Sequence, residues 1–189
     1  MFLKKICLAM VAAVCGAAAL FSISAKNSSR TVSAHGNDKT MREFVQSVIK
    51  GVDDPRLDGY SLGVEIVPPV SYLSGSGAFP ICVGRYCNIM FTSTFWGEHD
   101  DPQKKTILLH ELGHVANGEI DEGGALPSQI RADAFAAANV SKCGVSPLVL
   151  VSLLMRYQVV SPSLTVEHRI MQVRAFIRGR ELMEKRSFW

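Results

Sequence analysis

The sequence lacks internal repeats, low-complexity tracts and any strong excess of charge of one sign. Its 20 basic and 17 acidic side chains nearly balance, and two of the basic ones are lysines at the extreme N-terminus. Such a balance provides no positive field for a polyanion, so we expect no nucleic-acid partner. With 189 residues, 48% of them hydrophobic, the chain is long enough for one globular domain with its own core.

Residues 1–25 have the pattern of a secretory signal. Lys4 and Lys5 precede a long apolar run, and small residues follow it. The run also approaches the length that spans a bilayer, so an uncleaved membrane anchor is the alternative. In both cases we expect the rest of the chain to be exported, to the periplasm or out of the cell. The polar residues 26–39 predict a flexible tether, and residues 40–189 the functional domain.

Cysteine is scarce beyond the signal, where only Cys82, Cys87 and Cys143 remain. Two β-rich stretches flank Gly84-Arg85, which predicts a hairpin with a two-residue turn. That turn makes Cys82 and Cys87 a non-hydrogen-bonded pair, whose Cα atoms lie about 4.5 Å apart. In an oxidising compartment we therefore predict a Cys82–Cys87 disulfide, with Cys143 left as a buried thiol.

The remaining pattern predicts an α+β domain. Apolar and polar residues alternate over residues 62–66, as in a half-buried strand, and residues 78–92 supply the hairpin. Helices are expected over residues 40–50, 101–117, 129–138, 146–155 and 162–185. We take Asp101 and Ser128 as the N-caps of the second and third helices. The prediction is a small antiparallel sheet packed on a helical bundle.

The second of these helices carries the residues with the clearest chemistry. His110 and His114 are four positions apart, so both lie on one helix face and can point a ring nitrogen at one ion. Glu111 lies close enough to reach water on that ion without being a ligand, as a general base does. Zinc would lower the pKa of the water to about 7 and polarise a peptide carbonyl.

The surroundings of the motif are uncharged, because its neighbours are Leu108, Leu109, Leu112 and Gly113. Two histidines on an otherwise buried helix would be costly without partners, which favours a metal site. The alternative is a core helix whose histidines are satisfied by hydrogen bonds.

The segment His110-Glu-Leu-Gly-His114, followed by Arg131-Ala-Asp-Ala-Phe-Ala136, resembles the gluzincin branch of the zincin metallopeptidases. The resemblance covers about residues 100–140. It implies a further zinc ligand on the helix that follows the motif helix, normally a glutamate four residues before an aspartate that orients a zinc-bound histidine. Here Gln129 stands four residues before Asp133.

We therefore predict that His110, His114 and the charged Asp133 bind zinc. An orienting role for Asp133 is the alternative, in which case Gln129 or one of the loop carboxylates Glu119, Asp121 and Glu122 closes the site.

The resulting hypothesis is a cell-envelope zinc peptidase that acts on a peptide or protein, with Glu111 as general base. The resemblance also implies that substrate adds a strand to a sheet edge, for which residues 87–95 are candidates. Phe95 and Trp96 then line a subsite or belong to the core. The competing hypotheses are a zincin-shaped binding or scaffold module without hydrolytic activity, which the Gln129 departure allows, and a helical domain without metal.

Overall fold

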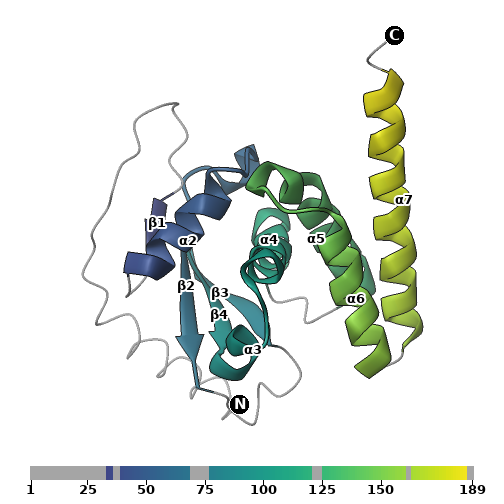
Figure 1. Ribbon diagram of the computed structural model, residues 1–189. Coiled ribbons are helices and arrows are strands. Elements are labelled where there is room, and N and C mark those ends of the chain that lie inside the picture. The colour runs from purple at the N-terminus through teal and green to yellow at the C-terminus, as the bar shows by residue number, and fades with distance from the viewer. Residues whose placement is uncertain (1–32, 36–38, 69–76, 121–124, 161–162, 187–189) are drawn as a thin grey trace.

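A mixed four-stranded sheet and a set of helices form the domain (Figure 1). The computed structural model describes residues 33–35, 39–68, 77–120, 125–160 and 163–186. The signal or anchor predicted for residues 1–25, and the loop residues Asp121 and Glu122, lie outside these ranges. Within them, no helix is both long enough and apolar enough to cross a bilayer.

The strands are β1 (Ser33–His35), β2 (Ser61–Val67), β3 (Ala78–Val83) and β4 (Tyr86–Thr92). They lie in the order β1-β2-β4-β3, with β2 parallel to both β1 and β4 and only β3 antiparallel to β4. The α+β fold is confirmed, but the antiparallel arrangement holds for the hairpin alone. Alternation could not predict the direction of β2, because parallel and antiparallel strands share a two-residue side-chain period.

Strand β1 falls within the segment predicted as a tether. Ser33 pairs with Ser61 and His35 with Gly63, in register along the edge of β2. The prediction of a tether over residues 26–39 is thus wrong for this stretch. Backbone donors and acceptors at a sheet edge can be paired by any extended segment, so a polar sequence does not prevent strand formation.

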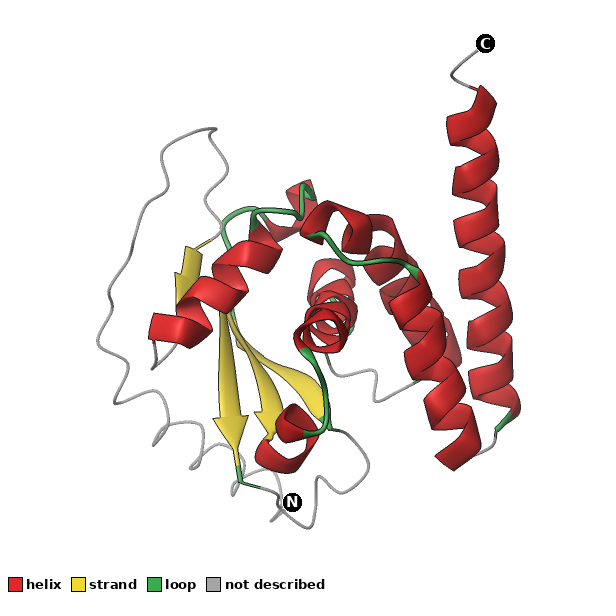
Figure 2. Cartoon of the chain, viewed as in Figure 1, coloured by secondary structure: helices red, strands yellow, loops and turns green. Residues whose placement is uncertain are grey.

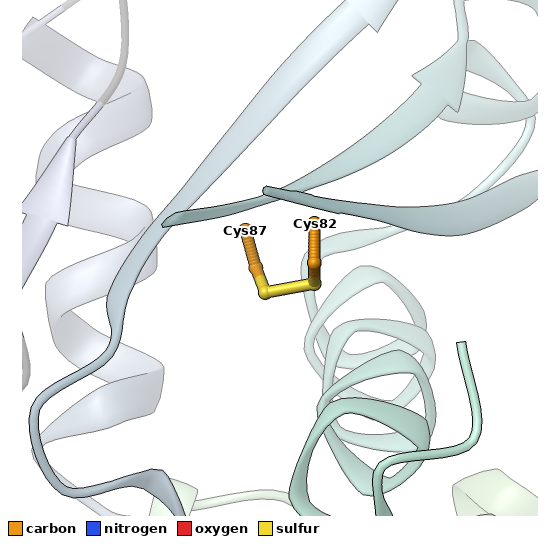
Figure 3. The surroundings of a disulfide bond; sticks show 2 residues. All are labelled: Cys82 and Cys87. Carbon is orange, nitrogen blue, oxygen red and sulfur yellow. A yellow bond between two sulfur atoms is a disulfide. The ribbon is translucent and has the colours of Figure 1, made fainter. Parts of the chain in front are cut away.

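The hairpin has the predicted register and disulfide. Cys82 lies opposite Cys87, Val83 lies opposite Tyr86, and Gly84 adopts a positive φ of 61° at the turn. The cysteine Cα atoms are 4.1 Å apart and their sulfurs are bonded (Figure 3). Cys143 is a buried free thiol, also as predicted.

Replacing both Cys82 and Cys87 by alanine is expected to lower the free energy of unfolding by about 2 kcal/mol, because the bond closes only a short loop and so restricts the unfolded chain modestly. Urea denaturation of the oxidised wild type and the double variant measures the difference. The two proteins should become similar once the wild type is reduced. Equal midpoints under oxidising conditions would contradict the prediction.

The helices are α2 (Lys39–Ile49), α3 (Ser93–Gly97), α4 (Asp101–Asn117), α5 (Leu126–Asn139), α6 (Leu148–Val160) and α7 (Leu164–Arg186), with short 3₁₀ turns η1 (Pro55–Leu57) and η3 (Val140–Cys143). Helix α4 lies between the sheet on one side and α5 and α6 on the other (Figure 2). It is the central element of the fold, and it carries the motif.

Two local signals set the length of α4. Asp100 and Gln103 form a capping box, in which each side chain accepts a hydrogen bond from the backbone N–H of the other. The cap is therefore Asp100, one residue before the predicted Asp101. At the other end Gly118 takes a left-handed φ of 70°, as glycine does readily.

The core surrounds α4 on several sides. Val45 and Val48 of α2, Ile89 and Phe91 of β4, and Leu109 of α4 are all almost fully buried. Because α4 is covered both by the sheet and by helices, its polar residues Thr106, Glu111 and His114 are buried, whereas Asp101 at its start is exposed. The location of the motif thus follows from the central position of this helix.

Candidate metal and catalytic site

His110, Glu111 and His114 line one cavity of about 680 Å³. Its other walls come from the start of β3 and from α5, α6 and α7. Glu111 and His114 are only 8% and 6% exposed, and the two imidazole rings are 4.9 Å apart between centroids. The structure thus brings together the three motif residues that were expected to act as a unit.

Gly113 allows α4 and α5 to meet at this point. A Cβ atom on Gly113 would lie 2.8 Å from Ala132 Cα and 3.0 Å from Ala132 O, which is too close for any larger residue without a backbone shift. This contact sets α5 directly against the motif. Gln129 and Asp133, one helical turn apart, therefore lie beside the histidines.

Asp133 is buried and held by two basic groups. Arg169 of α7 donates from Nε to Oδ2 at 2.7 Å and from an Nη atom to Oδ1 at 2.9 Å. His110 Nδ1 lies 2.8 Å from Oδ1, although this nitrogen has no well-aligned hydrogen bond among the described residues. Burial alone would raise the pKa of Asp133, but contacts with Arg169 and His110 more than offset it and hold the pKa below its usual value.

This geometry bears on the predicted ligand set. Both carboxylate oxygens of Asp133 are already engaged, and the side of His110 that faces Asp133 is its Nδ1 side. The opposite nitrogen of that ring, Nε2, is the one left for a ligand. The arrangement favours the orienting role of Asp133 over that of third ligand.

His114 has its own buried partners. Ser128 Oγ is 3.1 Å from His114 Nδ1 and donates its proton to Glu119 Oε2 at 2.9 Å, so it can only accept from the imidazole. Glu119 is also paired with Arg131. This chain of bonds assigns the Nδ1–H tautomer to His114 and leaves Nε2 with a lone pair. Burial, followed by the charge of His110, lowers the pKa of His114 to about 4, so the ring is neutral at pH 7.

Ser128 is a site residue that the sequence did not indicate. We had expected it to cap a helix, but α5 begins earlier, at Leu126, and Ser128 lies in its first turn facing α4. Glu119, in turn, is one of the loop carboxylates considered as a ligand. It lies 3.7 Å from His114 Nδ1, on the side of the ring away from the free lone pair.

Gln129 occupies the position next to that lone pair. Its Nε2 atom is 3.1 Å from His114 Nε2. The two ends of the amide are interchangeable by rotation, so either its nitrogen or its oxygen can face the imidazole. Gln129 thus occupies the place that the resemblance gives to the third ligand.

Glu111 is buried at the cavity wall. Burial, the largest influence, raises its pKa to about 7 against the opposing effects of His110 and Arg169. A carboxyl group with such a pKa can exchange a proton near neutral pH, as a general base must.

The two aromatic residues predicted either to line a subsite or to belong to the core have different positions. Phe95 lines the cavity, whereas Trp96 packs edge-on against Phe44 and Phe91 in the core. His99 is also buried, with Nδ1 2.7 Å from the carbonyl of Phe95. It faces inward because the turn after α3 folds it onto that aromatic ring.

On α7, Arg169 lines the cavity together with Thr165 and Val166. The neighbouring His168 is exposed and lies 3.3 Å from Gln172. On α6, Tyr157 also lines the cavity, while 41% of its surface remains exposed. No sequence pattern had indicated Tyr157 as a site residue.

The predicted substrate edge is misplaced. Strand β4 pairs with β2 on one side and β3 on the other, so the segment over residues 87–92 has no free edge. Strands β1 and β3 form the two edges of the sheet, and Ala78, Phe79 and Pro80 at the start of β3 line the cavity. Any strand that adds to the sheet beside α4 would therefore pair with β3.

The candidate ligand side chains are numerous enough for a divalent ion, but they are electrically neutral. His110 and His114 each contact their buried partner through Nδ1, and the Gln129 amide lies 3.1 Å from His114 Nε2. Among the residues that the structure describes, no three His, Cys, Asp or Glu side chains converge as a metal site. Two imidazoles and an amide could hold zinc, without a carboxylate ligand.

Comparison with known proteins yields no match among family models, curated proteins or solved structures. The chemistry of the site therefore has to be inferred from its own residues.

Proposed function

We propose that this chain is an exported zinc-dependent peptidase. The observation that carries the proposal is the shared cavity wall of His110, Glu111 and His114, with each imidazole contacted on its Nδ1 side by a different buried residue. A core helix with merely satisfied histidines would not need a buried carboxylate between them. Such a carboxylate costs folding free energy, so a catalytic role accounts for it better.

In this proposal His110 and His114 hold the metal. A bound zinc ion would supply Lewis acidity toward a peptide carbonyl and toward water. Glu111 accepts a proton from that water as the water attacks, and then returns it to the leaving amine. Asp133 is fixed by Arg169 and orients His110, and in this proposal it does not bind the zinc ion itself. Ser128 and Glu119 orient His114.

The substrate is a peptide or a protein segment in extended form. The terminal strand β3 presents Ala78 and Phe79 to the cavity and can pair with such a segment by backbone hydrogen bonds. Export is supported by the Cys82–Cys87 disulfide, since such bonds persist in oxidising compartments. Attachment to a membrane through residues 1–25 stays a prediction.

Metal analysis of the purified chain tests this proposal. We expect about one zinc per chain, a higher melting temperature with zinc than with chelator, and loss of both effects in His110→Ala and His114→Ala. His168→Ala is the matched control, because His168 is an exposed histidine on α7 outside the cavity wall. A wild-type protein that binds no zinc, or a His168→Ala variant that loses zinc equally, would refute a site at the motif.

A second candidate is a zincin-shaped binding or scaffold module. The amide of Gln129, in place of an acidic ligand, is the observation that favours it. Such a module would bind its partner equally well after Glu111→Gln, whereas a peptidase would lose turnover.

A further inference from the structure

We infer that Gln129 supplies the third metal ligand through its side-chain amide oxygen, giving an electrically neutral set with His110 and His114. The inference rests on the proposed zinc site and specifies its composition. It begins from the position of Gln129 on α5, one turn before Asp133, where α5 touches α4 at Gly113. The Gln129 side-chain amide is the hydrogen-bond partner of His114 Nε2, at 3.1 Å.

The distance between the Gln129 amide and His114 Nε2 is close to that between two atoms that bind the same metal ion. The Gln129 amide and His114 Nε2 are 3.1 Å apart. Two donors bound at 2.0–2.1 Å in a tetrahedron lie about 3.3 Å from each other. Rotation of the amide by half a turn exchanges its nitrogen for its oxygen without moving the chain, so the acceptor end can face the same point.

The described carboxylates near the site have other partners. Asp133 gives both oxygens to Arg169, and one of these also faces His110. Glu119 lies on the Nδ1 side of His114, bound by Ser128 and Arg131. Glu111 is the proposed base. Gln129 is therefore the side chain left to complete the set.

A neutral ligand set has two consequences. The ion keeps its full double positive charge, so it binds less tightly than at a site with an acidic ligand, and it acts more strongly on water and on a carbonyl. Gln129→Glu should therefore tighten zinc binding at least about 10-fold, and Gln129→Met, which keeps the length but has no oxygen donor, should weaken it at least about 10-fold.

Zinc affinity is measured on the full chain by competition with a chromophoric chelator, alongside the visible absorption spectrum of the cobalt(II)-loaded protein. We expect both Gln129 variants to change the cobalt spectrum. Gln172→Met is the matched control, because Gln172 forms a similar contact of 3.3 Å with His168 on the exposed face of α7 and should change neither measurement. Melting temperatures of the metal-free variants check that each one is folded.

The possible results separate the two proposals. If the wild type binds no zinc, the peptidase proposal itself fails. If zinc binding depends on His110 and His114 but Gln129→Met binds as tightly as the wild type, only the present inference is overturned. Loss of zinc in Asp121→Ala or Glu122→Ala, with Gln129→Met unaffected, would assign the third ligand to the loop and would also overturn it.

Discussion

Glu111→Gln is expected to lower kcat for peptide-bond hydrolysis by about 10²–10⁴-fold while leaving zinc content unchanged. The amide keeps the shape of the side chain but cannot accept a proton from water. Turnover of an unfolded protein substrate measures the effect, with metal content determined on the same samples. Glu98→Gln, which changes an exposed carboxylate after α3, is the control. Unchanged turnover in Glu111→Gln would exclude Glu111 as the base, and a wild type without any turnover would favour a binding module.

The same substitution should stabilise the metal-free protein above neutral pH. The pKa of Glu111 is raised from 4.5 to about 7 in the folded state, so the folded protein holds this proton more firmly than the unfolded chain. The protonated Glu111 side chain therefore contributes fully to the free energy of unfolding below about pH 4.5, and this contribution is lost as the pH rises through 7. At pH 8 the loss amounts to at most about 3 kcal/mol. Urea unfolding of chelator-treated samples measures the free energy of unfolding at pH 5 and at pH 8. Between these pH values it should decrease less in Glu111→Gln than in the wild type, and equal decreases would contradict this.

Arg169→Ala is expected to lower the free energy of unfolding by about 3–5 kcal/mol, because it leaves the Asp133 carboxylate buried without its partner. Arg169 and His110 hold the pKa of Asp133 below 3.8 despite burial, so in the wild type the pair stabilises the fold above that pH and the contribution is lost on acidification. Without Arg169, burial dominates and favours the protonated acid. The loss in the variant should thus be largest near neutral pH and shrink as the pH falls.

A double-mutant cycle with Asp133→Asn isolates the pair. The double variant should lose less stability than the sum of the two single variants, because neither partner is then left charged and buried. Arg178→Ala, an exposed arginine on the same helix, controls for removal of positive charge from α7. Additive losses would show that Arg169 and Asp133 do not stabilise one another.

Features that depend on local pattern were predictable from the sequence. The capping signals and glycine located α4 to within one residue, and the turn at Gly84 fixed the register that brings Cys82 to Cys87. The sequence could not predict that β2 runs parallel to β4, since strand direction depends on pairing between segments that are distant along the chain.

The same distinction applies to the site. His110, Glu111 and His114 belong to one helix, so their proximity follows from helical spacing. Arg169 meets Asp133 across 36 positions of sequence, and only the packing of α7 brings them together. A usable signal was present, because Arg169 lies three residues after Val166 and four before Val173, on the apolar stripe of its helix. A charge on a buried stripe calls for a buried partner.

The distance along the chain between the motif and its last supporting residue affects when the centre becomes complete. During synthesis, α4 and α5 are made before Arg169 on α7, so Asp133 lacks its ion-pair partner until most of the chain has been synthesised. An incomplete chain would hold His110 less firmly, because Asp133 would lack the ion pair that fixes it. The motif helix alone therefore does not complete the site, which is finished only when α7 has packed against α5.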